Sequence, residues 1–493
     1  MAQANKQTSP VDGWFNTYRV SGSQESTETA KQFYFVESNA PINVDRASDP
    51  HELTGKIRLT PSSTSEIFDE IAKTLKESWE KSNLTILVHG FNNPSESLIN
   101  KLYVEAYQAM HDIKIGQENS VCIAYRWPSE NIVAPWKSLL SAAPRTLLAI
   151  LLLGLGLLFL SLFKDVWTWP AWLLLGFVIG AFTLRIIVYY RDQYRATHYG
   201  GPDLVELVRD LDNRLGKQGL KRNNRVRLSF VAHSMGGYVV TNAIRILSDL
   251  FTPQAIGARG RLAESGDFGE LAKLGNHFTL GQLVLVSPDI PAEVLISNRA
   301  NVLATSLRRF PEAYLFSNEG DEVLRMVSTI ANYFTYPTAS HDYGYRLGNA
   351  SIHPDPAQGG HNSLWVGFKT LKQLEDSLKD QGEQVDFSFQ GTLTYFDCTY
   401  FKDDNDPTTL TGDLKESDKT LSALRHVLIF IGYLRSKYDV HGGYFYTPFL
   451  RNLIFGLAND GFAETDKTYN IKQSCQSKRI KILLSDSRAG KEG

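Results

Sequence analysis

The sequence predicts an α/β fold, in which helices cover both faces of a mostly parallel sheet. Short apolar segments of strand type alternate with longer helical segments along most of the 493 residues, which is typical of βαβ units. One strand-to-helix junction carries a central serine, Ser234, with small residues on both sides. A third observation is a pair of uncharged, apolar segments within 145–190, at 146–163 and 166–184, each long enough for a membrane span. We therefore expect an α/β domain with an inserted two-helix membrane hairpin.

The elements follow from the apolar patterns in chain order. Residues 65–81 place Ile67, Ile71, Leu75 and Trp79 on one helical face. The expected strands are 32–37, 84–88, 121–125, 226–231, 280–287, 313–317 and 391–399, the last clear one. The other expected helices are 97–111, 190–215, 239–247, 424–434 and 448–457. Gly-rich and polar stretches at 259–276 and 332–384 are expected to be surface excursions.

These elements predict five parts of the chain. They are a polar and poorly ordered N-terminal segment (1–30), the first part of the α/β domain (31–140), the hairpin (145–190), the remainder of the domain (191–470) and a C-terminal tail (471–493). The formal net charge of −2 offers no electrostatic basis for nucleic-acid binding. The three cysteines are far apart and form no metal-ligand spacing, so neither a metal nor an organic cofactor is expected.

The segment Val231–Gly237 has the pattern of a nucleophile elbow, the sharp strand–turn–helix of the α/β-hydrolase fold. Ala232 and Gly236 are small enough to allow the turn, and Ser234 is the candidate nucleophile. The alternative is a Gly-rich turn that contains a serine by chance. A serine hydroxyl is a weak nucleophile and needs a base, an acid and oxyanion donors. We assign the oxyanion donors to the backbone N–H groups of Met235 and Phe91, since Phe91 follows a buried strand upstream of the elbow.

The acid and the base come later in the chain in this fold. Asp289 follows the first strand after the elbow and Asp321 the second, which is the usual position, so Asp321 is the preferred acid and Asp289 the alternative. Of the eleven histidines, His441 lies on a loop beyond the last strand and before a helix. It is the preferred base, and His361 is the alternative. We expect His426, within an apolar helix, to be structural.

The hairpin consists of residues 146–163 and 166–184, which contain no charged residue. Tryptophans cluster at their connection, as aromatic residues do at membrane interfaces. Arg145 at one outer end and Arg185 and Arg191 at the other place those ends in the cytoplasm by the positive-inside rule. We expect a membrane protein with two spans and a cytoplasmic catalytic domain, in a bacterial inner membrane. A buried apolar helix pair, a substrate lid and a re-entrant hairpin are the alternatives.

Several motifs together resemble the bacterial α/β-hydrolases of the DUF900 esterase/lipase-like type. They are His89-Gly90-Phe91-Asn92-Asn93, Trp127-Pro128-Ser129, Tyr190-Arg191-Asp192, Ala232-His233-Ser234-Met235-Gly236, Ser287-Pro288-Asp289, Ser317-Asn318 with Asp321, and His441-Gly442-Gly443-Tyr444-Phe445. The resemblance implies a hydrolase with a Ser–His–Asp triad. Where the family has a short loop, this chain carries the hairpin.

Together these observations predict a membrane-anchored serine hydrolase that cleaves carboxylic esters, of the lipase or phospholipase type. The expected partners are the lipid bilayer and an ester or lipid substrate, with a possible homo-oligomer formed through the hairpin. The alternative is a non-catalytic membrane protein on a hydrolase scaffold, used for assembly, sensing or membrane perturbation.

Overall fold

The computed structural model describes most of the predicted α/β domain. The described residues are 13–22, 32–40, 57–91, 99–112, 120–129, 189–248, 272–295, 306–307, 309–325, 345–380, 391–403 and 406–485. All but the last two residues of the predicted hairpin at 145–190 lie outside them. Among the helices within these ranges, none has both the length and the apolar character that a bilayer span requires.

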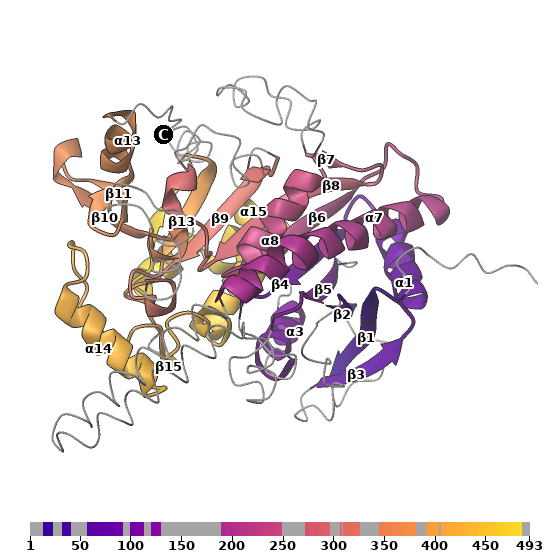
Figure 1. Ribbon diagram of the computed structural model, residues 1–493, viewed down its shortest axis with the longest axis horizontal. Coiled ribbons are helices and arrows are strands. Elements are labelled where there is room, and N and C mark those ends of the chain that lie inside the picture. The colour runs from indigo at the N-terminus through magenta and orange to yellow at the C-terminus, as the bar shows by residue number, and fades with distance from the viewer. Residues whose placement is uncertain are drawn as a thin grey trace, which may run out of the picture.

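An 11-stranded sheet forms the centre of the molecule, with the order β16-β13-β9-β8-β6-β4-β5-β2-β1-β3 and β7 paired to β8 (Figure 1). Its strands are β1 (Phe15–Gly22), β2 (Phe33–Ser38), β3 (Ile57–Ser62), β4 (Asn83–Val88), β5 (Ser120–Arg126), β6 (Val226–His233), β7 (Lys273–Leu274), β8 (Phe278–Val286), β9 (Glu312–Ser317), β13 (Leu393–Asp397) and β16 (Lys481–Leu483). Every neighbouring pair from β2 to β13 is parallel. The predicted mostly parallel sheet is therefore confirmed.

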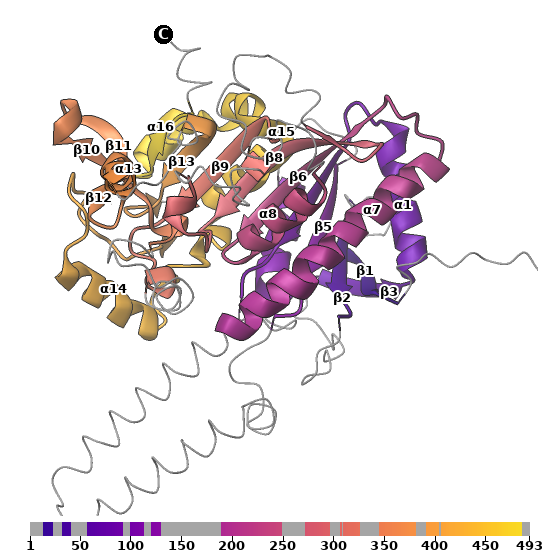
Figure 2. The same cartoon turned by 45° about the horizontal axis from the view of Figure 1, so that its top comes forward.

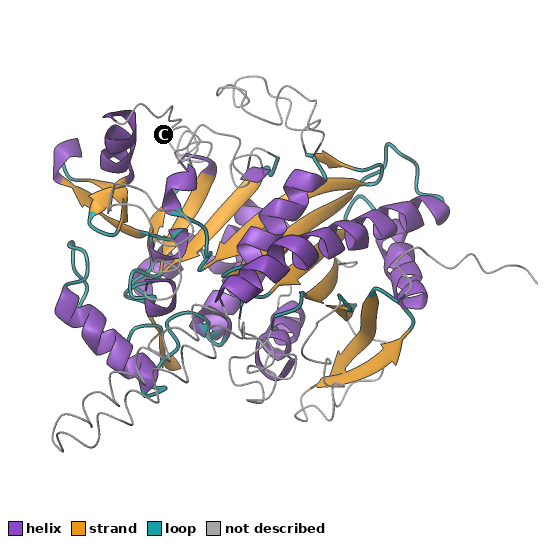
Figure 3. Ribbon diagram, in the orientation of Figure 1, coloured by secondary structure: helices purple, strands orange, loops and turns teal. Residues whose placement is uncertain are grey.

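Helices cover both faces of this sheet, as Figure 3 shows by colour. On one face lie α1 (Thr64–Glu77), α7 (Gly201–Lys217) and α8 (Gly236–Ile246), and on the other α3 (Val104–Asp112) and α15 (Pro448–Tyr469). Successive strand residues point to opposite faces. In β4, Leu84, Ile86 and Val88 pack toward α1, α7 and α8, while Leu87 packs toward α3 and α15. The apolar runs predicted as buried strands are buried for this reason.

Several helices differ from the expected ranges. The helix expected over 65–81 ends at Glu77, so Trp79 lies beyond it. The helix expected over 97–111 is α3 preceded by a π-helical turn, η1 (Ile99–Tyr103). Residues 189–195 are helical and continue through a second π-helical turn, η2 (Ala196–Gly200), into α7. The helix expected to end at 457 continues to Tyr469, with a kink at Gly461.

The two ends of the chain contribute strands that the sequence analysis missed. β1 lies within the segment expected to be poorly ordered, and it pairs with β2 and β3 while burying Phe15 and Val20. The expected C-terminal tail contains α16 (Ile471–Ser477) and β16, which pairs antiparallel with β13. Residues 391–399 therefore do not hold the last strand. β1 lies between β2 and β3, and β16 is a short strand at the opposite edge of the sheet, so pairing with strands distant in the sequence stabilises both.

The region expected to be a surface excursion at 332–384 contains a second sheet. Its strands are β10 (Ser351–Asp355), β11 (His361–Val366) and β12 (Lys369–Thr370), followed by α13 (Leu371–Asp380). Ile352, Leu364 and Leu371 are buried and join the core cluster of α1, α7 and α8. A two-stranded sheet, β14 (Lys402–Asp403) with β15 (Asp406–Thr409), precedes α14 (Ala423–Leu434).

Candidate active site

Ser234 lies in a sharp turn between β6 and α8, at the carboxyl end of the parallel sheet. Its φ of 53° is in the left-handed region, which serine rarely adopts. Two backbone hydrogen bonds hold the turn: the Ser234 N–H donates to the oxygen of Val286 at 2.9 Å, and the Gly237 N–H donates to the oxygen of Ser234 at 3.0 Å. This geometry is that of a nucleophile elbow.

Two glycines let the end of β4 approach this turn closely. A Cβ at Gly236 would lie 2.4 Å from the backbone oxygen of Val88, and a Cβ at Gly90 would lie 2.6 Å from Cβ of Ser234. Neither position has room for a side chain. The close approach sets the backbone of Gly90 against Ser234, with Phe91 directly after it and Met235 directly after Ser234.

The loop of Gly90 is held in place by His89 and Trp127. Their rings stack with centroids 5.1 Å apart, and Trp127 Nε1 donates to the backbone oxygen of His89 at 2.8 Å. Burial, together with the nearby charge of Arg126, lowers the pKa of His89 to about 3, so its imidazole is neutral. His89 therefore supports this loop as a structural group.

Asp321 lies in the turn after β9 and is fully buried. Its Oδ1 accepts hydrogen bonds from the backbone N–H groups of Val323 (3.1 Å) and Leu324 (3.2 Å). Its Oδ2 accepts from the Ser287 hydroxyl at 2.5 Å and lies 2.6 Å from Nδ1 of His441. These contacts orient the carboxylate towards a single imidazole.

His441 lies on the loop between α14 and η8 (Gly443–Phe445), where the Asp439 carboxylate accepts from the N–H groups of His441 (3.1 Å) and Gly442 (2.8 Å). Burial by itself lowers the pKa of His441. The charge and hydrogen bond of Asp321 outweigh it, with smaller contributions from Asp439 and Asp289, and the pKa lies above its usual 6.5. The structure thus brings the preferred acid and the preferred base together.

His233 is a residue of the site that the sequence analysis treated only as a motif position. Its Nε2 lies 3.0 Å from the backbone oxygen of His441, and the two rings are 4.8 Å apart. Burial, and next the charge of His441, lower the pKa of His233 to about 3. A neutral ring donates from Nε2 to this carbonyl. His233 therefore links the residue next to Ser234 to the loop of His441, and its place in the elbow motif was the only available signal.

The alternative acid and base have other surroundings. Asp289 is buried near the elbow, and its N–H donates to the backbone oxygen of Ser234 at 3.1 Å, but its carboxylate pairs with Arg346 at 3.0 Å. His361 is exposed at the start of β11 in the second sheet. His426 pairs with Glu322 at 2.6 Å, in keeping with the structural role expected for it.

The insertion that holds the predicted hairpin begins and ends beside this site. The Ser129 hydroxyl donates to Oδ2 of Asp192 at 2.9 Å, which joins the last residue described before the insertion to the first helix after it. In that helix the ring of Tyr189 contacts the ring of Phe91 edge-on at 5.9 Å, and its hydroxyl accepts from Arg346 at 3.1 Å. The ends of the insertion are thus connected both to each other and to the candidate site.

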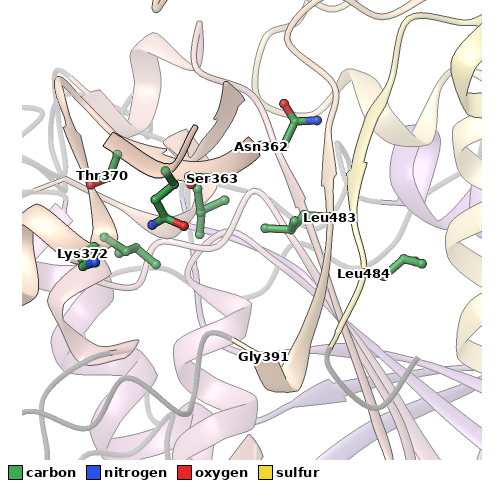
Figure 4. Close-up of a pocket in the computed structure, with 10 residues that line it drawn as sticks. Asn362, Ser363, Thr370, Lys372, Gly391, Leu483 and Leu484 are labelled. Carbon is green, nitrogen blue, oxygen red and sulfur yellow. The ribbon is translucent and has the colours of Figure 1, made fainter. Parts of the chain in front are cut away.

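No group of three or more His, Cys, Asp or Glu side chains in the described ranges could hold a metal ion. A cavity of about 230 Å³ lies between the second sheet and the chain around β16 (Figure 4). None of the residues proposed for catalysis lines it. The residues lining the cavity include Asn362, Ser363, Thr370, Lys372 and Leu483.

Comparison with known proteins identifies one family. Residues 63–379 match the family model described as alpha/beta hydrolase of unknown function (DUF900). The match spans well over half of the chain and includes Ser234, Asp289 and Asp321, while His441 lies beyond it. No curated protein and no solved structure matches the chain.

Proposed function

The chain belongs to the DUF900 family of α/β-hydrolases of unknown function, and from that premise we propose that it is a serine hydrolase that cleaves carboxylic esters. The observation that carries the proposal is the hydrogen bond of 2.6 Å between Asp321 and His441. His441 is in turn held by the residue next to Ser234. In this scheme Ser234 is the nucleophile, His441 the base and Asp321 the acid that orients it.

The proposed reaction has two halves. His441 takes the proton of the Ser234 hydroxyl as the oxygen attacks the ester carbonyl, and the backbone N–H groups of Phe91 and Met235 stabilise the oxyanion. The tetrahedral intermediate then expels the alcohol, which takes the proton from His441. Water loses a proton to His441 and attacks the acyl-enzyme. Ser234 leaves with that proton, and the carboxylic acid is released.

We further propose that the protein is anchored in a membrane by the hairpin at 145–190, with the catalytic domain on the cytoplasmic side, and that its substrate is a lipid ester. The support is the uncharged sequence of the two hairpin segments, 146–163 and 166–184, and the contact of Tyr189, at the end of the hairpin, with Phe91. A substrate drawn from the bilayer would then enter beside the proposed oxyanion donors. This membrane protein would have the bilayer as its partner and could form a homo-oligomer through the hairpin.

A fluorophosphonate probe tests the nucleophile independently of the substrate. Labelling is expected for the wild type and for Ser477→Ala, an exposed serine on α16, and it is expected to be lost in Ser234→Ala. The proposal would be contradicted if Ser234→Ala were still labelled, or if the wild type were not labelled. The latter result would favour a non-catalytic protein on a hydrolase scaffold.

The substrate class is tested separately, by measuring fatty acid released from a native lipid extract. We expect release by the wild type and by Ser477→Ala, and none by Ser234→Ala. If Ser234→Ala releases as much fatty acid as the wild type, a lipid ester is not the substrate of this site.

A further inference from the structure

Helix α14 turns an entirely apolar face towards solvent. Leu424, Val427, Leu428 and Ile431 are 69%, 53%, 56% and 38% exposed. Their spacing of three and four residues places them on one side of the helix. Soluble proteins rarely expose contiguous apolar surface, and such a patch marks a site of interaction.

The opposite face of α14 is held firmly against the candidate site. His426 is buried and pairs with Glu322, the residue after Asp321, at 2.6 Å. Ile429 is buried against the same loop, since a Cβ at Gly320 would lie 3.0 Å from it. The Ser422 side chain caps the helix by accepting from the Arg425 N–H at 3.4 Å. The apolar face therefore belongs to a well-supported helix whose other side is already occupied.

Within residues 419–438, which include α14, the charged side chains are all cationic, and Asp418 and Asp439 lie directly outside this stretch. Between Lys419 and Tyr438 the chain carries Lys419, Arg425, Arg435 and Lys437 and no aspartate or glutamate. An apolar helical face bordered by cations is the arrangement that binds an anionic lipid surface, because burial of apolar side chains and attraction to the head groups act together.

We propose that α14 is an interfacial helix, which lies in the surface of an anionic bilayer with Leu424, Val427, Leu428 and Ile431 among the lipids. The inference rests on the proposed membrane attachment and extends it to a second point of contact. In Figure 2, α14 and the N-terminal end of the helix that continues into α7 both lie at the lower edge of the part of the chain drawn in colour. That end is where the chain returns from the predicted hairpin, so one bilayer could contact both.

This contact would set the orientation of the candidate site relative to the bilayer. The inner face of α14 contacts the loop of Asp321, and the chain leaving α14 reaches His441 within a few residues. A bilayer on the outer face of α14 is therefore separated by this one helix from the loop that carries the proposed acid. A lipid ester could then reach Ser234 without crossing bulk water.

A fluorescent label at position 427 measures the contact directly. The three native cysteines are buried, so a dye reacts selectively with Val427→Cys. The full-length chain is reconstituted in vesicles of phosphatidylcholine and phosphatidylglycerol, with and without lipids brominated in the acyl chain. We expect a blue-shifted emission that the brominated lipids quench, whereas Gln476→Cys on α16, an exposed control position, should show neither effect.

Two outcomes would overturn the proposal. An emission at position 427 that matches the control and is quenched by aqueous iodide means that the face stays in water. A blue shift that brominated lipids leave unchanged means that protein covers the face, either a second copy or another segment of the chain. Neither fluorescence result depends on enzyme turnover. A failure of the hydrolase proposal is therefore distinguishable from a failure of the proposal that α14 contacts the bilayer.

A charge-insertion variant tests what the contact does. In Leu424→Glu/Leu428→Glu we expect hydrolysis of a vesicle-borne ester to fall about tenfold or more, because two exposed leucines of the proposed lipid-contacting face are replaced by charges that anionic lipids repel. Hydrolysis of a soluble short-chain ester and fluorophosphonate labelling should be unchanged. Ile246→Glu, an equally exposed residue at the end of α8, is the control. An equal loss on both substrates, or no loss on vesicles, would contradict the proposal.

Discussion

His233 Nε2 lies 3.0 Å from the backbone oxygen of His441, a residue 208 positions further along the chain. The contact joins the residue before Ser234 to the loop of the proposed base. Because its pKa is lowered to about 3 by burial and by His441, His233 stays neutral and donates this hydrogen bond throughout the working pH range. His233 is therefore a positioning residue.

Replacing His233 tests this positioning role. In His233→Ala we expect kcat/KM for a short-chain ester to fall about tenfold, since a buried carbonyl loses its donor and the His441 loop loosens. The pH at which activity falls should stay near that of the wild type, because the base itself remains. A total loss of activity, or a lost acid limb of the pH profile, would instead mean that His233 transfers the proton.

Matched substitutions distinguish between the two candidate bases, His441 and His361. His441→Ala should lower kcat by about a thousandfold or more, the loss expected when a triad base is removed. His361→Ala should retain wild-type activity, because His361 is exposed in the second sheet. Both rates are measured on purified protein with a short-chain ester. The opposite pattern would assign the base to His361.

The pH dependence follows from the pKa of His441, which Asp321 holds above 6.5 against the effect of burial. A base acts only when it is neutral, so kcat/KM should fall as the pH drops through this raised pKa, with a midpoint above 6.5. In Asp321→Asn the midpoint should move to lower pH, since the negative charge is gone. A wild-type midpoint below 6.5 would contradict the assignment.

Ser287 should shift the same midpoint in the opposite direction. Its hydroxyl donates to Oδ2 of Asp321, and Ser287→Ala leaves that carboxylate with one donor fewer. The carboxylate then attracts the imidazolium more strongly, so the midpoint should rise, while kcat/KM falls about fivefold. Ser317→Ala serves as the control, because the equally buried Ser317 hydroxyl has no hydrogen-bond partner among the described residues. A midpoint that falls in Ser287→Ala would refute this reasoning.

Gly236 is required for packing at the elbow. A Cβ there would lie 2.4 Å from the Val88 oxygen, so Gly236→Ala should lower the free energy of unfolding by about 2 kcal/mol. The neighbouring Gly237→Ala meets nothing closer than 3.4 Å and should change stability little. Denaturant unfolding of both variants measures the difference. Equal stabilities would show that β4 can move away from the elbow at little cost.

Much of the fold could be predicted because it depends on residues that are close together in the sequence. The buried strands around Leu84–Val88 and Val226–Val231 are short apolar runs, and the turn at Ser234 needs small neighbours that the sequence displays. β1 and the short edge strand β16 were missed because neither contains a continuous apolar run, and partners distant in the sequence hold both in place. The second sheet at 351–370 was missed for the same reason.

The candidate site, too, was determined partly by the sequence and partly by the tertiary structure. By itself the sequence determined the parallel α/β sheet and the elbow with Ser234, since strand, turn and helix there are neighbours in the chain. It reduced the acid and the base to two candidates each. Only the tertiary structure decided that Asp321 meets His441, that Asp289 pairs with Arg346 and that His233 holds the His441 loop. Those contacts join loops from separate strand ends, and their distances depend on how the whole sheet packs.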